Sequence, residues 1–172
     1  MRIVTTPMCE EIVKLAGISD YVVNKHPDEE DGDLAILLSE SKVKMDSLPI
    51  KLNTSRQVFE SIKKVSEIAQ NELSDDDIKG FFTDYPISFK YLNDDFHHDI
   101  DVKVYSEFLK DIVLDVGFNI VEDNPDYVVY PDYLKEKVVE KDNLIEMPSH
   151  SGVSPNPFER IEGRYSILET LI

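Results

Sequence analysis

The sequence predicts an α/β fold, with one or two Rossmann-like parallel sheets and flanking helices. Short apolar runs such as Leu34–Leu38 are continuous, which is typical of strands buried on both faces of a parallel sheet. Residues 58–69 instead repeat their apolar side chains at helical spacing. Strands and helices alternate over short connections, and this alternation favours parallel strands joined by helices.

The first half of the chain opens with a strand that leads directly into a helix. Thr6 is expected at the N-cap of this helix, Pro7 at its first position and Gly17 just past its end. Such a turn lies at the edge of the sheet where open α/β folds bind ligands. We expect the next elements to be a strand at 21–23, an acidic loop at 27–33, strands at 34–38 and 48–52, and a helix capped by Asn53-Thr54-Ser55.

The second half repeats this pattern after a helical connector at residues 71–86, in which Ser74 caps an acidic turn. The repeat predicts two pseudo-repeated βαβ lobes, at 1–70 and 87–172. A single domain spanning 1–172 is the alternative, because any two βαβ segments resemble each other at this level. The correspondences are 112–118 with 12–18, 126–130 with 33–37, 144–147 with 48–51, a closing helix that starts at Asn156 and Pro157, and a first strand expected at 87–92.

Composition limits the partners and the location. The formal net charge of −17 argues against nucleic acid and anionic membranes as partners, because both are themselves negative. The acidity suits solubility, a cation or a basic protein surface. A single cysteine excludes an internal disulfide, and no apolar run reaches the roughly 18 residues that span a bilayer. No secretory signal is recognisable, so we expect a cytoplasmic protein.

The order of these motifs resembles the lobes of the nitrogenase-component-like and class III metal-chelate binding proteins, a superfamily that binds corrinoids, siderophores and metals. The chain also resembles short conserved proteins of methanogenic archaea. The first resemblance implies a ligand site on the loops after the strands and a link to metallocofactor machinery, and the second implies a link to methanogenesis machinery. The family's export signal, spacer helix and cluster-binding cysteines are missing, which argues against cluster ligation and extracellular uptake. The resemblance rests on residues 3–17, 33–38, 48–68, 124–129 and 145–151.

Two groups could carry chemistry. Cys9 is expected in the first turn of a helix, where the dipole favours the thiolate as a nucleophile or metal ligand. The alternative is that Cys9 fills the core beside Ile12 and Val13. His97 and His98, close to two aspartates, are candidate ligands for a metal or a metal-tetrapyrrole cofactor, although neighbouring side chains on a strand point to opposite faces.

Several polar residues are expected at the carboxyl ends of the strands. The loop that follows 144–147 adds hydroxyl groups and the imidazole of His150 to this edge. Arg160 and Arg164 are expected instead in surface ion pairs with nearby glutamates. The candidate ligand-binding residues are Thr5, Thr6, Cys9, Asn53, Thr54, His150 and Ser151.

The leading hypothesis is a non-enzymatic accessory or binding protein of the cytoplasm. It would hold a small ligand or a partner protein in a crevice at the carboxyl ends of the strands. One alternative is a metal- or tetrapyrrole-dependent enzyme that uses Cys9 or the His97–His98 pair. The other is a structural subunit that docks a basic partner through its acidic surface.

Overall fold

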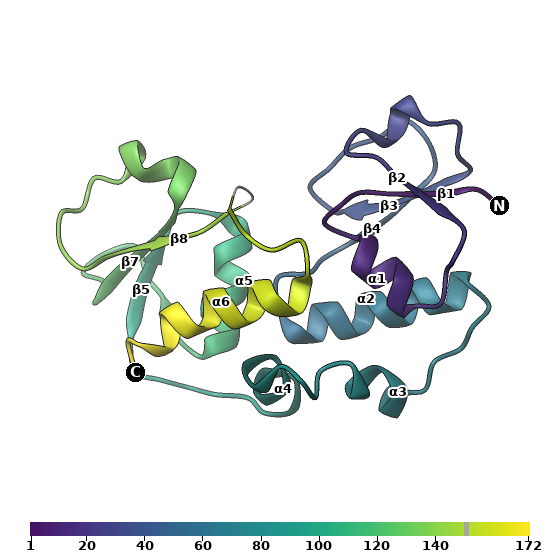
Figure 1. Ribbon diagram of the computed structural model, residues 1–172. Helices are drawn as coiled ribbons and strands as arrows, with labels where there is room; N and C mark the ends of the chain where they lie inside the picture. Colours follow the sequence, from purple (N-terminus) through teal and green to yellow (C-terminus); the bar gives the residue numbers. More distant parts are fainter. Residues whose placement is uncertain (150–151) are drawn as a thin grey trace. The chain divides into compact units, whose positions relative to one another are not determined.

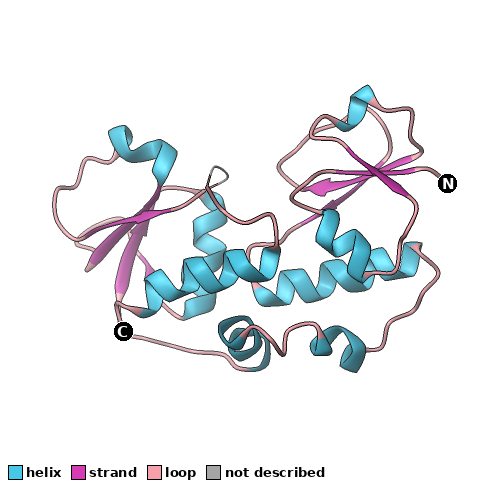
Figure 2. Cartoon of the chain, viewed as in Figure 1, coloured by secondary structure: helices cyan, strands magenta, loops and turns pink. Residues whose placement is uncertain are grey.

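The computed structural model describes residues 1–149 and 152–172 (Figure 1). The chain divides into two units, Met1–Asp84 with residues 155–157, and Tyr85–Ser154 with residues 158–172. Each unit holds one four-stranded sheet, and every pair of strands is parallel (Figure 2). This confirms the predicted α/β class with parallel sheets and flanking helices.

The sheet of the first unit has the strand order β2-β1-β3-β4. Its central strands, β1 and β3, are the most deeply buried, as their continuous apolar sequences predict. In register, Ile3 lies between Tyr21 and Leu34. The elements of this unit are β1 (Ile3–Thr5), α1 (Glu10–Leu15), β2 (Tyr21–Val23), the 3-10 helix η1 (Pro27–Glu29), β3 (Leu34–Leu38), β4 (Ser47–Ile50), α2 (Ser55–Ile68) and α3 (Asp75–Gly80).

The helix α2 supplies much of the core of the first unit. The side chain of Thr54 accepts a hydrogen bond from the backbone N–H of Gln57 at 3.2 Å, so this residue is the N-cap. Val58, Ile62 and Val65 then repeat on one face, and all three are fully buried. The helix α1 packs against α2 (Figure 2), which explains why both helices place an apolar stripe on one side.

The second unit repeats the order of the first, as β6-β5-β7-β8. The two sheets also share a reciprocal pair of hydrogen bonds that involves an aspartate just before the third strand. Arg2 N donates to the Asp33 carboxylate at 2.6 Å while Asp33 N donates back to Arg2 O, and Asp101 and Asp126 make the same reciprocal pair. The elements are α4 (Pro86–Asn93), β5 (Asp101–Val104), α5 (Glu107–Val116), β6 (Asn119–Ile120), β7 (Tyr127–Pro131), the 3-10 helix η2 (Asp132–Lys137), β8 (Leu144–Met147) and α6 (Pro157–Glu169).

The reciprocal pairs and the shared strand order confirm the pseudo-repeat. The ends of α1 and α5 agree as well. Gly17 and Gly117 both have a positive φ, of 94° and 102°, and the residue after each donates a backbone hydrogen bond to Val13 and Val113 respectively. The predicted boundaries of the connector stay a prediction.

Residues 87–92 form the helix α4, so the strand predicted there is wrong. Pro86 occupies the first helical turn, where its fixed φ suits a helix. The Glu162 carboxylate accepts backbone hydrogen bonds from Ile87 and Ser88 at 3.0 and 3.1 Å and so caps the helix. The first strand of this unit is β5 instead, which begins at Asp101.

The start of α1 also differs from the prediction. The helix begins at Glu10 with Cys9 at its N-cap, so neither Thr6 nor Pro7 has the predicted role. Residues 6–9 form a turn closed by a 3.0 Å hydrogen bond from Cys9 N to Thr6 O. Among the helices of the described residues, none is long and apolar enough to cross a membrane.

Candidate functional site

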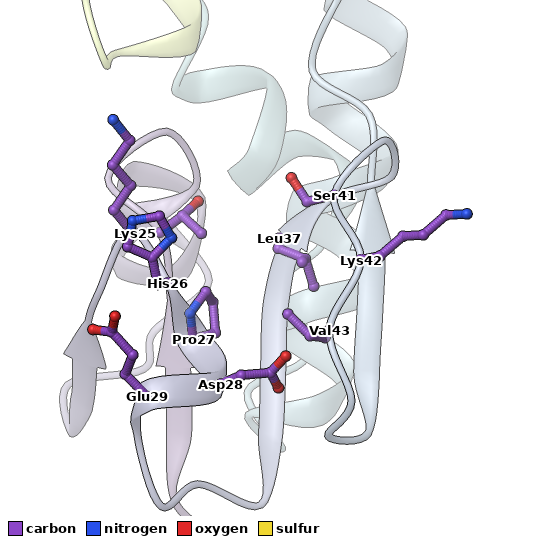
Figure 3. Close-up of a pocket in the computed structure, with 10 residues that line it drawn as sticks. Lys25, His26, Pro27, Asp28, Glu29, Leu37, Ser41, Lys42 and Val43 are labelled. Atoms are coloured by element: carbon purple, nitrogen blue, oxygen red, sulfur yellow. The ribbon is translucent and has the colours of Figure 1, made fainter.

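A hollow of about 510 Å³ lies at the carboxyl ends of the first three strands of the first unit (Figure 3). Thr6 follows β1, residues 25–29 follow β2, and residues 41–43 follow β3, so nearly all of the lining leaves the same edge of the sheet. The lining residues are Thr6, Lys25, His26, Pro27, Asp28, Glu29, Leu37, Ser41, Lys42 and Val43.

The strand order explains why a hollow forms at this edge. From β1 the chain crosses to β2 on one side, and from β2 it returns past β1 to β3 on the other. The connections therefore diverge next to β1. In open α/β sheets such a switch point leaves a crevice outside the carboxyl ends of the strands, and ligands bind there.

The middle of the hollow is apolar. Pro27 is buried on one wall, while Leu37 and the half-buried Val43 lie on the other (Figure 3). Leu37 belongs to β3 and is 1% exposed, so the sheet itself fixes this surface. An apolar surface of this kind can cover the hydrocarbon part of an organic ligand.

Asp28 joins the two walls of the hollow. Its carboxylate accepts hydrogen bonds from the backbone N–H of Lys44 at 2.9 and 3.0 Å, and a longer one of 3.4 Å from Met45. Asn24 holds the start of the same wall, because its side chain accepts from His26 N at 2.8 Å and donates to Glu30 at 3.0 Å. The hollow is thus preformed.

Four polar side chains at the other end of the hollow are unpaired. The hydroxyl groups of Thr6 and Ser41, the His26 imidazole and the Lys25 ammonium group have no hydrogen-bond or ion-pair partner in the part of the chain that the structure describes. Lys25 and His26 lie on one wall and Ser41 on the opposite one (Figure 3). These groups are available to a ligand.

The matching edge of the second sheet is different, because its polar groups bind one another. Tyr105 follows β5 as Thr6 follows β1, and its hydroxyl group donates to Glu140 at 2.6 Å. Lys103 forms an ion pair with the other oxygen of Glu140 at 2.7 Å. These hydrogen bonds from Lys103 and Tyr105 lower the pKa of the Glu140 carboxyl to about 2.

The structure brings one of the sequence-predicted ligand residues, Thr6, to the hollow. The Thr5 hydroxyl group is buried and donates to Ile36 O at 2.8 Å. Cys9 is fully buried in the core, as the second interpretation of this residue expected. Asn53 and Thr54 lie at the start of α2, where Thr54 is the cap.

The remaining candidates lie in the second unit or outside the described residues. His150 and Ser151 are not among the residues that the structure describes. His98 packs edge-on against Phe118 with 5.9 Å between ring centres, and the adjacent His97 is exposed. Within residues 1–149 and 152–172, no three His, Cys, Asp or Glu side chains gather as metal ligands, so this pair has no third ligand there.

Arg160 and Arg164 are buried, with exposed fractions of 5% and 6%, so the predicted surface pairs are wrong. The Arg164 guanidinium group donates to the backbone oxygens of Pro148 and Ser149 at 3.1 and 3.3 Å and lies 5.1 Å from the Phe108 ring centre. Burial lowers the pKa of Arg164 to about 10. The arginine therefore holds the chain after β8.

Sequence reasoning missed most of the lining residues. The sequence predicts an acidic loop at residues 27–33, and this loop comes soon after a strand at the carboxyl edge of a parallel sheet. That position is the available signal, because Lys25 and His26 follow β2 by only two and three residues. Ser41 and Val43 follow β3 by three and five residues.

Two repeated, all-parallel α/β units with this strand order define a class of fold found in solute-binding proteins. No family model matches the chain, and no curated protein matches it. Solved structures do match. The periplasmic vitamin B12 binding protein BtuF of Vibrio cholerae is similar with a TM-score of 0.53 and 10% identity, over 98% of this chain and 96% of that one.

Periplasmic metal binding proteins from Candidatus Liberibacter asiaticus are similar to the same degree. The cadmium-bound structure has a TM-score of 0.55 and 7% identity, and the manganese-bound structure 0.56 and 6%, each over 100% of both chains. At these identities the likeness concerns the fold alone. It confirms the predicted resemblance to chelate-binding proteins at that level.

Proposed function

We propose that this protein binds a small organic ligand, without chemical conversion, in the hollow at the carboxyl ends of β1, β2 and β3. The observation that carries the proposal is a preformed hollow of about 510 Å³ in which four polar side chains are unpaired. Ligand sites in proteins enclose roughly 300–1,000 Å³ and combine apolar walls with a few polar groups, and this hollow has both features.

The similar structures support a binding role, since they are named for binding vitamin B12 and metals. The donor set here favours an organic molecule over a bare metal ion, because no cluster of three metal-ligating side chains occurs in the described part of the chain. The cytoplasmic location, a partner protein and the link to metallocofactor or methanogenesis machinery stay predictions.

An enzymatic role for Cys9 has less support than binding. The side chain is fully buried, and a nucleophile must reach its substrate. Cys9 does not line the hollow, whereas Thr6, which belongs to the same turn, does. A hydroxyl group in that position can donate and accept hydrogen bonds, which suits recognition.

Native mass spectrometry of the chain purified gently from its native cells tests the proposal. We expect a bound small molecule at one copy per chain. The substitution Val43→Phe fills the hollow and should remove the adduct. Val139→Phe is the matched control, because it adds the same ring at a valine that is 77% exposed in the second unit. No adduct, or one that Val43→Phe retains, would contradict the proposal.

A further inference from the structure

We infer that the ligand of this hollow is a small organic anion, whose carboxylate or phosphate group binds at the end formed by Thr6, Lys25, His26 and Ser41. The inference rests on the proposed function and names the chemical class of the ligand. It follows from which polar groups around the hollow are already paired and which are not.

The two acidic residues of the hollow differ from its unpaired donors. The two oxygens of Asp28 share the backbone N–H of Lys44, and one of them also accepts a longer hydrogen bond from Met45 N. The side chain of Glu29 extends away from the hollow (Figure 3). A cation at Asp28 would therefore share a carboxylate that already holds the two walls together.

The unpaired groups are donors suited to an anion. Lys25 contributes an ammonium group at the end of an extended side chain, and His26 a ring N–H, both from the same wall (Figure 3). Thr6 and Ser41 add two hydroxyl groups. Hydrogen bonds from charged donors to a carboxylate or phosphate are about twice as strong as neutral ones, so this end would discriminate an acid from its uncharged analogue.

The apolar part of the hollow determines the chemical character of the ligand beyond its anionic group. Pro27, Leu37 and Val43 form an apolar surface that polar groups of the ligand would not match. The anionic group would therefore be attached to a compact hydrocarbon or ring. Because the whole chain carries a net charge of −17, attraction of an anion must come from these local groups and not from the overall field.

Matched pairs of ligands test the inference directly. Calorimetric titration of the full chain uses aromatic and branched aliphatic carboxylates, each with its primary amide, and phosphate monoesters, each with its parent alcohol. We expect acids to bind at least about tenfold more tightly than their uncharged partners. The better of the two acid series identifies the anionic group.

Substitutions assign that preference to the hollow. Lys25→Gln and His26→Gln should each weaken acid binding, by about tenfold for Lys25→Gln, and leave the amides and alcohols unchanged. Lys64→Gln is the matched control, an exposed lysine of the same unit that does not line the hollow. Thermal unfolding of each variant verifies that it is folded.

The outcomes separate this inference from the proposed function. Uncharged members that bind as tightly as their acids, and lose binding with Val43→Phe, would overturn the anion and leave the ligand site in place. Acid binding that Lys25→Gln does not weaken would overturn the inference in the same way. If no member of either series shows binding that Val43→Phe weakens, both the inference and the proposed function are overturned.

Discussion

Two adjacent threonines at the end of β1 have different roles, one in stability and one in ligand binding. Thr5 is buried and its hydroxyl group binds Ile36 O across the sheet, whereas Thr6 lines the hollow with an unpaired hydroxyl group. Thr5→Val should lower the free energy of unfolding by about 1 kcal/mol and leave ligand affinity unchanged. Thr6→Val should weaken binding with little change in stability. Urea unfolding and calorimetry together measure both effects, and an exchange of the two results would contradict the assignment.

Asp28 joins two loops through hydrogen bonds from backbone N–H groups to its carboxylate. Asp28→Ala leaves the N–H groups of Lys44 and Met45 without this acceptor, so the free energy of unfolding should fall by about 1 kcal/mol. Asp31→Ala removes the same charge from an exposed position of the same loop and should have little effect. Equal losses in the two variants, measured by urea unfolding, would mean that charge and not bracing matters.

At the scale of elements, the two helix-ending glycines differ in what surrounds them. Both have a positive φ, which costs any other residue about 1–3 kcal/mol. A Cβ at Gly117 would also collide with the backbone of Phe96, while at Gly17 it would meet the end of the flexible Asn71 side chain. Gly117→Ala should therefore lower the melting temperature more than Gly17→Ala. The reverse order, in thermal unfolding of the two variants, would contradict this packing.

The paired edge of the second sheet should respond to acid. The pKa of Glu140 is depressed in the folded chain, so the unfolded state binds more protons as the pH falls from the ordinary value towards about 2. The stabilisation by Glu140 is present above its unfolded pKa and is lost across that range. Glu140→Gln should therefore flatten the pH dependence of stability between about pH 5 and pH 2. An unchanged slope in urea unfolding would contradict the role of the Lys103–Glu140 pair.

For the whole molecule, the fold was more predictable than the site. Alternating strands and helices, and the correspondence of residues 12–18 with 112–118, predicted parallel sheets and their repeat. The strand predicted at residues 87–92 is wrong because a run of six polar and apolar residues is compatible with a strand or a helix. The residue that caps the helix, Glu162, is distant in sequence. The surface ion pair predicted for Arg164 is wrong because its partners are the backbone oxygens of Pro148 and Ser149, and the pattern of charges in the sequence does not reveal them.

The net charge of −17 is also a property of the whole molecule. Like charges repel one another in the compact chain, and salt screens them over about 10 Å at 0.1 M. Raising sodium chloride from about 0.02 M to about 0.2 M should therefore raise the melting temperature. A decrease in a thermal scan would show that attractive ion pairs outweigh this repulsion.

The central claim, that the hollow of the first unit holds the ligand, is tested most directly by hydrogen–deuterium exchange. The chain is compared with its native ligand bound and after the ligand has been removed. Bound ligand should slow exchange in residues 25–29 and 41–43, the two loops that line the hollow. Ligand-dependent protection elsewhere in the chain, with none in these two loops, would contradict the account.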